Sequence, residues 1–317
     1  MKRFLSSGNT LVLIAALLWG TSFVAIEWGF KESTINPILF VFLRFILASL
    51  VFLPIALFKI SGLKRLLISK EIIIISFCNA IAFLLQFLGQ QHTTAGKASL
   101  FVNFYAITVP LFAPLILPEK YSWRVLVSAI LGFSGAFFVT TNLNFAEITS
   151  GTIRGDLLTL GSGLAWTAYI LLSKKLLEKE KEQSGIGIFF GTVVWTTLFL
   201  GFALPIALVN KTWSEISSQF NWQAIIAIIY LAIVCTASAF AIYMEGLKRS
   251  EAGESAIYML LEVVVAFILG WIIFKNEYQT WEIVGTVLIV FAILFVSIKI
   301  NKKSSKVAKN KEIEEGT

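Results

Sequence analysis

Charged side chains are scarce in this chain. Only 14% of its 317 residues are charged, whereas 57% are hydrophobic, and the mean hydropathy is +0.82. So few polar side chains cannot cover the surface of a soluble domain. The chain divides instead into continuous apolar runs of about 18 to 25 residues, the length of a helix that crosses a hydrocarbon core of roughly 30 Å. These runs lack the alternation of a β-barrel strand, so the sequence predicts an all-α membrane protein.

Residues that support catalysis or metal binding are equally few. His92 is the only histidine and Asp156 the only aspartate, and Cys78 and Cys235 both lie within apolar runs. This composition argues against a disulfide framework, a metal centre and histidine-based catalysis. The GxxxxGK[ST] motif of ATP-driven proteins does not occur. We therefore predict that the chain is not an enzyme and holds no metal or other cofactor.

Ten apolar runs are long enough to span a membrane, and short connectors separate them. Tryptophans stand near several run ends, where their amphipathic rings prefer the membrane–water interface. We predict ten transmembrane helices, at 10–29, 37–58, 72–91, 97–116, 123–141, 155–174, 185–208, 222–245, 252–273 and 281–299.

Lysine and arginine are distributed unevenly between the two sides of these helices. With the N-terminus placed inside, most of the 26 Lys and Arg residues fall in inside connectors or in the C-terminal tail. Because such residues are retained on the cytoplasmic side, we expect both termini in the cytoplasm and the chain in the cell membrane. The net charge of +7 therefore reflects orientation in a lipid bilayer, and no nucleic-acid partner is expected. The residues expected outside are Lys31, Lys97, Arg154, Lys211 and Lys275.

The two halves of the chain resemble each other. The matching segments are GQQHTTAGKAS (89–99) with GLKRSEAGESA (246–256), PEKYSW (118–123) with NEYQTW (276–281), and LLWGTSF (17–23) with LAWTAYI (164–170). Each half holds five predicted helices, and since five is odd, the second half must enter the membrane from the opposite side. Inverted repeats around a central site are an architecture of secondary transporters, because one half can rock against the other.

The opening LLWGTSFVAIE, the FLRF of the second span and the doubled EKYSW and NEYQTW motifs resemble EamA-type members of the drug/metabolite transporter superfamily. The likeness covers nearly the whole chain. It implies secondary transport of small metabolites, often export of amino acids or related compounds. It divides the chain into a cytoplasmic N-terminus (1–9), a first EamA-like repeat (10–141), an external linker (142–154), a second repeat (155–299) and a charged cytoplasmic tail (300–317).

This sequence departs from the family pattern in the ninth span. Family members usually carry a proline before the small residues of the late span in each half. The first half has Pro110 and Pro114, which we expect to kink the fourth span and to assist gating; a static kink is the alternative. The second half has Val263 at that place, so the resemblance does not carry a symmetric helix break over to the ninth span.

Glu262 lies near the centre of the ninth span, within LEVVVAFILGW. A carboxylate at that depth costs a few kcal/mol, so it should face water or the interior of the bundle. There it could bind a cationic group or take up the proton that couples transport. A structural role, such as a hydrogen bond to Tyr258 one turn away, is the alternative.

Arg44 is the charged residue of the second span. Arginine keeps its charge, so it requires a carboxylate, carbonyl groups or water. It could anchor the carboxylate of a substrate, or it could tie one helix to the end of another.

Further polar and aromatic side chains are candidates for the substrate pathway. Asn79, Phe83 and Gln86 share one face of the third span. The repeat alignment pairs Gln86 with Tyr243, and Tyr105 with Glu262. Interhelical hydrogen bonding or plain packing is the alternative for each. The complete predicted pathway is Asn79, Phe83, Gln86, Asn103, Tyr105, Trp166, Tyr243, Tyr258 and Glu262.

These observations predict a secondary transporter that exports a small metabolite through a midplane cavity by alternating access, with proton coupling as an option. A non-transporting sensor or scaffold is the main rival, and an intramembrane enzyme is the weaker one. The expected partners are a small-molecule substrate and the bilayer. A homodimer is compatible with the sequence but not required by it.

Overall fold

The computed structural model describes residues 8–31, 33–59, 63–93, 95–141, 143, 153–274 and 280–297. Several predicted features lie outside the described residues. They are the C-terminal tail, most of the linker, Lys275, and Glu277, which belongs to the NEYQTW motif. All ten predicted spans are present as helices long and apolar enough to cross a membrane. The prediction of an all-α membrane protein with ten such helices is confirmed.

The described residues of the first half of the chain form seven helices, of which six build the five spans. They are α2 (Gly8–Lys31), α3 (Pro37–Lys59), α4 (Leu63–Leu67), α5 (Lys70–Gln90), α6 (Ala95–Val102), α7 (Tyr105–Ile116) and α8 (Trp123–Thr141). The short α4 belongs to a connector, and α6 and α7 together form the fourth span. Ser69 caps α5 by accepting a hydrogen bond from the backbone N–H of Ile72, which satisfies one of the free donors at the helix start.

The last five spans follow the same plan with more interruptions. They comprise α10 (Ile153–Lys179), α11 (Gly185–Leu208), α12 (Trp213–Ser217), α13 (Trp222–Tyr230), the π-helix η1 (Leu231–Ser238), α14 (Ala239–Lys248), α15 (Ala252–Met259), α16 (Leu261–Phe274) and α17 (Thr280–Ser297). The eighth span consists of α13, η1 and α14, and the ninth of α15 and α16. The connector helix α12 begins with a capping box made by Thr212 and Glu215.

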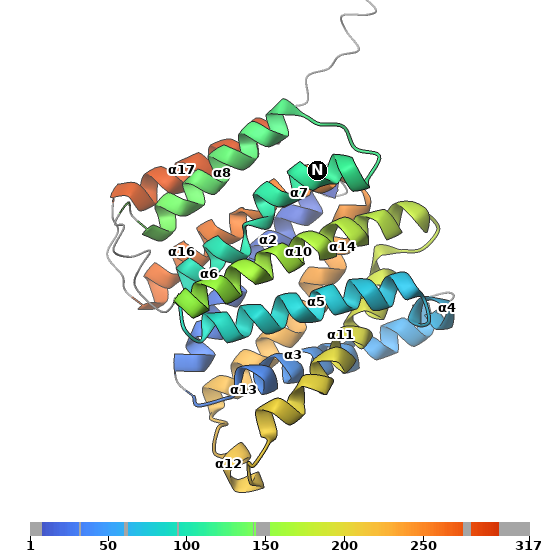
Figure 1. The fold of residues 1–317 in the computed structure, drawn as a ribbon, viewed down its shortest axis with the longest axis vertical. Coiled ribbons are helices and arrows are strands. Elements are labelled where there is room, and N and C mark those ends of the chain that lie inside the picture. Colours follow the sequence, from blue (N-terminus) through green and yellow to red (C-terminus); the bar gives the residue numbers. More distant parts are fainter. Residues whose placement is uncertain are drawn as a thin grey trace, which may run out of the picture.

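The helices lie side by side in a layered bundle (Figure 1). The pair α8 and α17 forms one edge, and α3, α11 and α13 form the opposite edge. Between them lie α2, α10, α14 and the fourth and ninth spans, so the centre of the bundle is lined by both halves of the chain. We call the end of the bundle that carries Gly8 and Lys179 the Gly8 end, and the opposite end, which carries Lys31 and Ile153, the Lys31 end.

Glycine contacts reproduce the inverted repeat at the two ends. At the Gly8 end, a Cβ atom added to Gly246 would lie 2.9 Å from the carbonyl oxygen of Gly8. At the Lys31 end, a Cβ added to Gly89 would lie 2.8 Å from the carbonyl oxygen of Gly155. Gly89 and Gly246 are aligned in the repeat, so the same close helix crossing, which only glycine permits, occurs once at each end.

Both late spans are broken, although only the first half carries the two prolines. In the fourth span the break falls at Asn103 and Phe104, and α7 continues without interruption through Pro110 and Pro114. Neighbouring helices hold a proline-containing segment in helical form when they pack on it, as α8 and α15 do here. The ninth span breaks at Leu260 without a proline, so the symmetric break that the sequence did not support is present.

Candidate functional site

A small cavity lies at the centre of the bundle, between the two repeats. Its volume of about 30 Å³ is roughly the share of one water molecule in the liquid. Sites for small organic ligands measure about 300 to 1,000 Å³. A metabolite can therefore occupy this place only after the surrounding helices move apart. The lining residues are Trp19, Ser22, Phe23, Arg44, Phe83, Gln86, Val102, Tyr105, Trp166, Ile170, Tyr243, Met259 and Glu262.

Glu262 reaches the cavity because the ninth span is broken just before it. The helix α15 ends at Met259, Leu260 forms the break, and Glu262 stands in the first turn of α16, where the helix dipole favours a negative charge. The residue is 4% exposed. The hydroxyl of Tyr105 donates a hydrogen bond to its Oε1 atom at 3.2 Å. The second carboxyl oxygen of Glu262, Oε2, can accept a hydrogen bond from a ligand.

Arg44 also lines the cavity and is buried, with 1% of its surface exposed. Its Nε atom donates to Oγ1 of Thr236 at 2.6 Å, and its Nη2 atom donates to the carbonyl oxygen of Cys235 at 3.4 Å. The third nitrogen, Nη1, has no hydrogen-bond partner among the residues that the structure describes. Among the described residues no carboxylate forms an ion pair with Arg44. Arg44 therefore ties helices together, as the structural alternative predicted, and keeps one donor for an anion.

The π-helix η1 supplies a carbonyl group that sequence reasoning missed. The carbonyl oxygen of Cys235 accepts hydrogen bonds from Nε1 of Trp19 at 2.6 Å and from Arg44. A π-helical segment widens the turn and changes which carbonyls the helix satisfies internally, so such segments often occur at functional sites. No proline or glycine marks this segment, LAIVCTAS, and its small residues indicated only close packing.

Aromatic rings make most of the cavity wall. The Trp19 ring lies 5.0 Å from that of Tyr243 and 6.2 Å from that of Trp166, measured between centroids. Phe83 packs edge-on against Trp166 at 5.0 Å and faces the Arg44 guanidinium carbon at 4.8 Å. Within the described part of the chain, the Trp166 Nε1 and Tyr243 hydroxyl groups are buried without a hydrogen-bond partner. The wall thus combines apolar surface with polar atoms that are available to a ligand.

The structure brings most of the predicted pathway together. Arg44, the predicted charge anchor, lines the cavity together with six of the predicted pathway residues, which are Phe83, Gln86, Tyr105, Trp166, Tyr243 and Glu262. Trp19 also lines the cavity. It was not predicted as a pathway residue, although it occupies the place in the first repeat that Trp166 occupies in the second. The other lining residues that the prediction lacked are Ser22, Phe23, Val102, Ile170 and Met259, which are ordinary residues of an apolar helix and carried no signal.

Three predicted pathway residues lie elsewhere. Asn79 donates to Oγ1 of Thr196 at 3.0 Å and joins α5 to α11. Tyr258 sits beyond the break in the ninth span, which turns it away from Glu262, and its hydroxyl accepts hydrogen bonds from Asn9 and Ser297. Asn103 occupies the break in the fourth span and donates to the carbonyl of Ser99 at 2.9 Å.

Polar contacts close the bundle at both ends of the cavity. At the Gly8 end, Nδ2 of Asn9 donates to Tyr258 at 3.0 Å and to Oε2 of Glu254 at 3.4 Å. At the Lys31 end, Nζ of Lys97 lies 3.0 Å from Oδ2 of Asp156. The repeat aligns Lys97 with Glu254, and Asp156 with Asn9, so these are the same helix junction in its two inverted copies.

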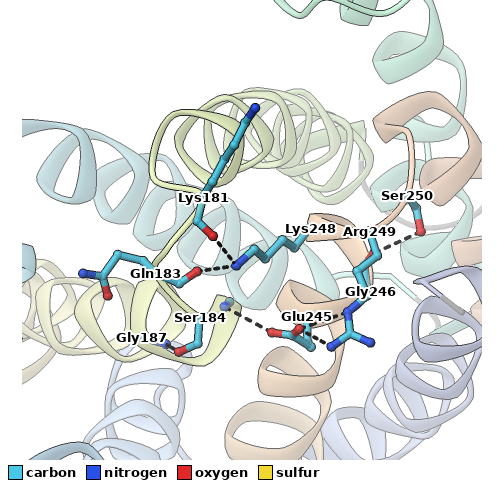
Figure 2. Close-up of polar contacts among 10 residues, drawn as sticks. Lys181, Gln183, Ser184, Gly187, Glu245, Gly246, Lys248, Arg249 and Ser250 are labelled. Atoms are coloured by element: carbon cyan, nitrogen blue, oxygen red, sulfur yellow. Dashed lines mark hydrogen bonds and ion pairs between the residues drawn. The ribbon is translucent and has the colours of Figure 1, made fainter. Parts of the chain in front are cut away.

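A second set of contacts fixes the Gly8 end of α14 (Figure 2). Lys248 donates to the carbonyl oxygens of Lys181 and Gln183 at 2.9 and 2.6 Å, and Glu245 accepts from the N–H of Gly185 at 3.2 Å. Lys174 reaches the turn after α14 and donates to the carbonyl of Ser250 at 2.7 Å. The ends of α10, α11 and α14 are thereby joined into one unit.

Curated proteins of similar sequence are named as transporters. An uncharacterized transporter of Archaeoglobus fulgidus is 26% identical over 93% of this chain and 98% of its own length. The uncharacterized transporter YoaV of Bacillus subtilis is 22% identical over 92% of this chain and 97% of its own. A probable amino-acid metabolite efflux pump of Salmonella typhimurium is 25% identical over 91% and 93%.

The fold and the family are also shared with known proteins. A protein crystal structure superposes with a TM-score of 0.73 at 15% identity, covering 92% of this chain and 96% of that one. The model of the EamA-like transporter family matches this chain twice, at residues 6–141 and 153–298. Two matches that together cover most of the sequence show that this membrane protein belongs to the EamA-like transporter family.

Proposed function

We propose that the protein is a secondary transporter that exports small zwitterionic metabolites, amino acids or close relatives of them, by alternating access. The observation that carries the proposal is the placement of Arg44 and Glu262 on one central cavity. A free guanidinium donor suits a carboxylate, and a carboxyl group suits an ammonium. The Salmonella relative, whose name refers to amino-acid metabolite efflux, supports this substrate class.

Alternating access is supported by the equivalent junctions at the two ends of the cavity. If the Asn9 junction opens while the Lys97 junction stays closed, the cavity faces the Gly8 end, and the reverse change exposes it to the other side. The cluster of lysines and arginines around the Gly8 end favours that end as the cytoplasmic one. Export then begins with an opening at Asn9 and ends with an opening at Lys97.

Glu262 is the proposed coupling residue. A carboxyl group in a site that opens alternately to two solutions can take a proton from one side and release it to the other. Among the described residues that line the cavity there is no second carboxylate. Neutralising Glu262 should therefore abolish proton-driven accumulation, and it should weaken the exchange of substrate without abolishing it, because Arg44 still binds the carboxylate.

The test is counterflow of a labelled amino-acid panel in proteoliposomes, with and without an imposed pH gradient. We expect the wild type and Glu262→Gln both to exchange a substrate, and only the wild type to concentrate it. Glu182→Gln, a change at an exposed residue of the α10–α11 connector, is the matched control and should behave as the wild type. Equal accumulation by Glu262→Gln would refute the coupling role.

Counterflow also separates the proposal from its rivals. A sensor or scaffold would exchange no compound although it is folded and correctly inserted. An enzyme would return a chemically altered compound, which mass spectrometry of the vesicle contents would detect. Recovery of the unchanged labelled compound from inside the vesicles supports transport.

A further inference from the structure

A second cavity lies on the outside of the bundle, apart from the central site. It is a groove of about 320 Å³ between α5 and α10 at the Gly8 end, where these two helices pack side by side (Figure 1). None of its residues lines the central cavity. The groove is lined by Glu71, Ile74, Ile75, Leu172, Lys175, Leu176 and Lys179.

The groove changes character along the helix axes. Its apolar part, with Ile74 and Leu172, lies farther from the helix ends and therefore deeper in the membrane. Ile74 is 54% exposed, so it faces the lipid. Its charged part lies in the first turn of α5 and the last two turns of α10, at the level where the chain leaves the hydrocarbon core. The apolar part of the groove therefore lies deeper in the membrane than the charged part. A phospholipid has the same order, with its acyl chain deeper than its headgroup.

The charged part of the groove carries an excess of positive charge. Lys179 is neutralised by Glu71, whose Oε1 atom lies 2.6 Å from its Nζ atom. Lys175, one turn before Lys179 on the same face, has no carboxylate partner among the described residues. A lysine ammonium of this kind beside lipid-exposed apolar side chains is complementary to a phosphate that is attached to an acyl chain.

We propose that the groove between α5 and α10 binds an anionic phospholipid, with its phosphate at Lys175 and an acyl chain along Ile74 and Leu172. The proposal stands on the contacts of the groove alone and does not depend on the transported substrate. It has a structural consequence, because Lys174, the neighbour of Lys175, points inward to hold the turn after α14. The same helical turn of α10 therefore contacts both the lipid and the closed Gly8 end.

The direct test is native mass spectrometry of the detergent-purified full chain, titrated with phosphatidylglycerol or with phosphatidylcholine of the same acyl chains. We expect the wild type to bind phosphatidylglycerol at least about five-fold more tightly, the factor of roughly one lysine near an anionic headgroup. Lys175→Gln should remove this preference. Lys181→Gln is the matched control, because its side chain points away from the polar cluster of the α10–α11 connector (Figure 2), and it should leave the preference unchanged.

A second variant tests the acyl-chain part of the groove. Ile74→Trp should fill the groove and lower the affinity for phosphatidylglycerol at least about four-fold, the factor for one acyl CH₂ group that loses its burial. Ile225→Trp, at a similarly exposed position on α13, should not. Size-exclusion elution and melting temperature check that each variant is folded. Glycerol phosphate, a soluble competitor, should not displace the lipid.

Three results would overturn the proposal. The first is equal wild-type affinity for the two lipids. The second is unchanged lipid preference in folded Lys175→Gln together with unchanged affinity in folded Ile74→Trp. The third is displacement of the lipid by glycerol phosphate at equal concentration, which would indicate a phosphate site without an acyl chain. None of these results bears on whether the chain transports a metabolite, so the two proposals fail separately.

Discussion

Tyr105 and Glu262 are equivalent residues of the two repeats, separated by 157 positions, and they are hydrogen-bonded to each other at 3.2 Å. Two equivalent positions can touch only where the axis that relates the repeats passes between them. Each stands directly after the break in its span, at the start of α7 or α16. The broken spans therefore cross at their breaks in the centre of the bundle, where the cavity lies, and each second half packs against the first half of the other span, α7 on α15 and α16 on α6.

Tyr105→Phe removes the donor of this contact and keeps the ring. A hydrogen bond to a charged group contributes about 1.5 to 3 kcal/mol, and its loss leaves a buried carboxyl oxygen unsatisfied. We expect a lower melting temperature in detergent and a higher KM for the exchanged substrate. Tyr121→Phe, a change at an exposed tyrosine in the connector before α8, should alter neither quantity. An unchanged KM and melting temperature in Tyr105→Phe would show that the contact is dispensable.

The sequence predicted the fold better than the site. Hydrophobic run lengths are set by the thickness of the membrane, so all ten spans could be located. Glu262 and Arg44 could be singled out because ionisable groups are costly in lipid. The break at Leu260 and the π-helix around Cys235 could not, since both depend on how neighbouring helices pack rather than on local residues. Tyr258 was misplaced for that reason, as the break removes it from the face of Glu262.

Thr236 and Thr196 are a matched pair of residues that distinguishes an effect on the cavity from an effect on stability alone. Both are buried threonines that bind a polar side chain, Thr236 that of Arg44 and Thr196 that of Asn79. Each Thr→Val change should lower stability by about 1 to 3 kcal/mol, because a buried donor loses its acceptor. Only Thr236→Val should also raise the substrate KM, since it releases the guanidinium that lines the cavity. Equal KM values in the two variants would assign Arg44 a purely structural role.

Gly285 and Gly270 test the packing of the edge pair α8 and α17. A Cβ on Gly285 would collide with the carbonyl oxygen of Gly135, whereas a Cβ on Gly270 would meet no atom of the described residues within 4 Å. Gly285→Ala should destabilise the protein by about 1 to 3 kcal/mol through overpacking. Gly270→Ala should be neutral or stabilising by up to about 1 kcal/mol, because alanine favours the helix. Thermal unfolding in detergent measures both, and a stable Gly285→Ala variant would contradict the close approach.

Glu119 should make the stability of the protein depend on pH. Burial raises the pKa of Glu119 above its usual value, although the N–H groups of Ala252 and Gly253 donate to its carboxyl oxygens and oppose the shift. A raised pKa means that the folded state favours the protonated form, so its contribution to stability is complete below the unfolded pKa of about 4.3. The contribution is lost as the pH rises through the folded pKa.

Glu119→Gln imitates the protonated form at every pH. The melting temperature of the wild type minus that of Glu119→Gln should therefore fall between pH 4 and pH 7.5. The comparison at each pH cancels the titration of all other groups. A difference that stays constant, or that grows with pH, would show that the carboxylate is the form that the folded state prefers.

The Lys97–Asp156 and Asn9–Glu254 junctions should set which side of the membrane reaches the cavity. Ser22→Cys, in a background with Cys78→Ala and Cys235→Ala, places a single thiol on the cavity wall. Asp156→Asn should accelerate its labelling by an impermeant reagent from the Lys31 end, by about ten-fold if the pair contributes roughly 1.4 kcal/mol to closure. Asn9→Ala should accelerate labelling from the Gly8 end and slow it from the other, because opening at one end excludes opening at the other. Lys211→Gln, an exposed change at the Lys31 end, should have no effect. Faster labelling from both sides in either variant would indicate general loosening of the bundle and would contradict the assignment of one junction to each side.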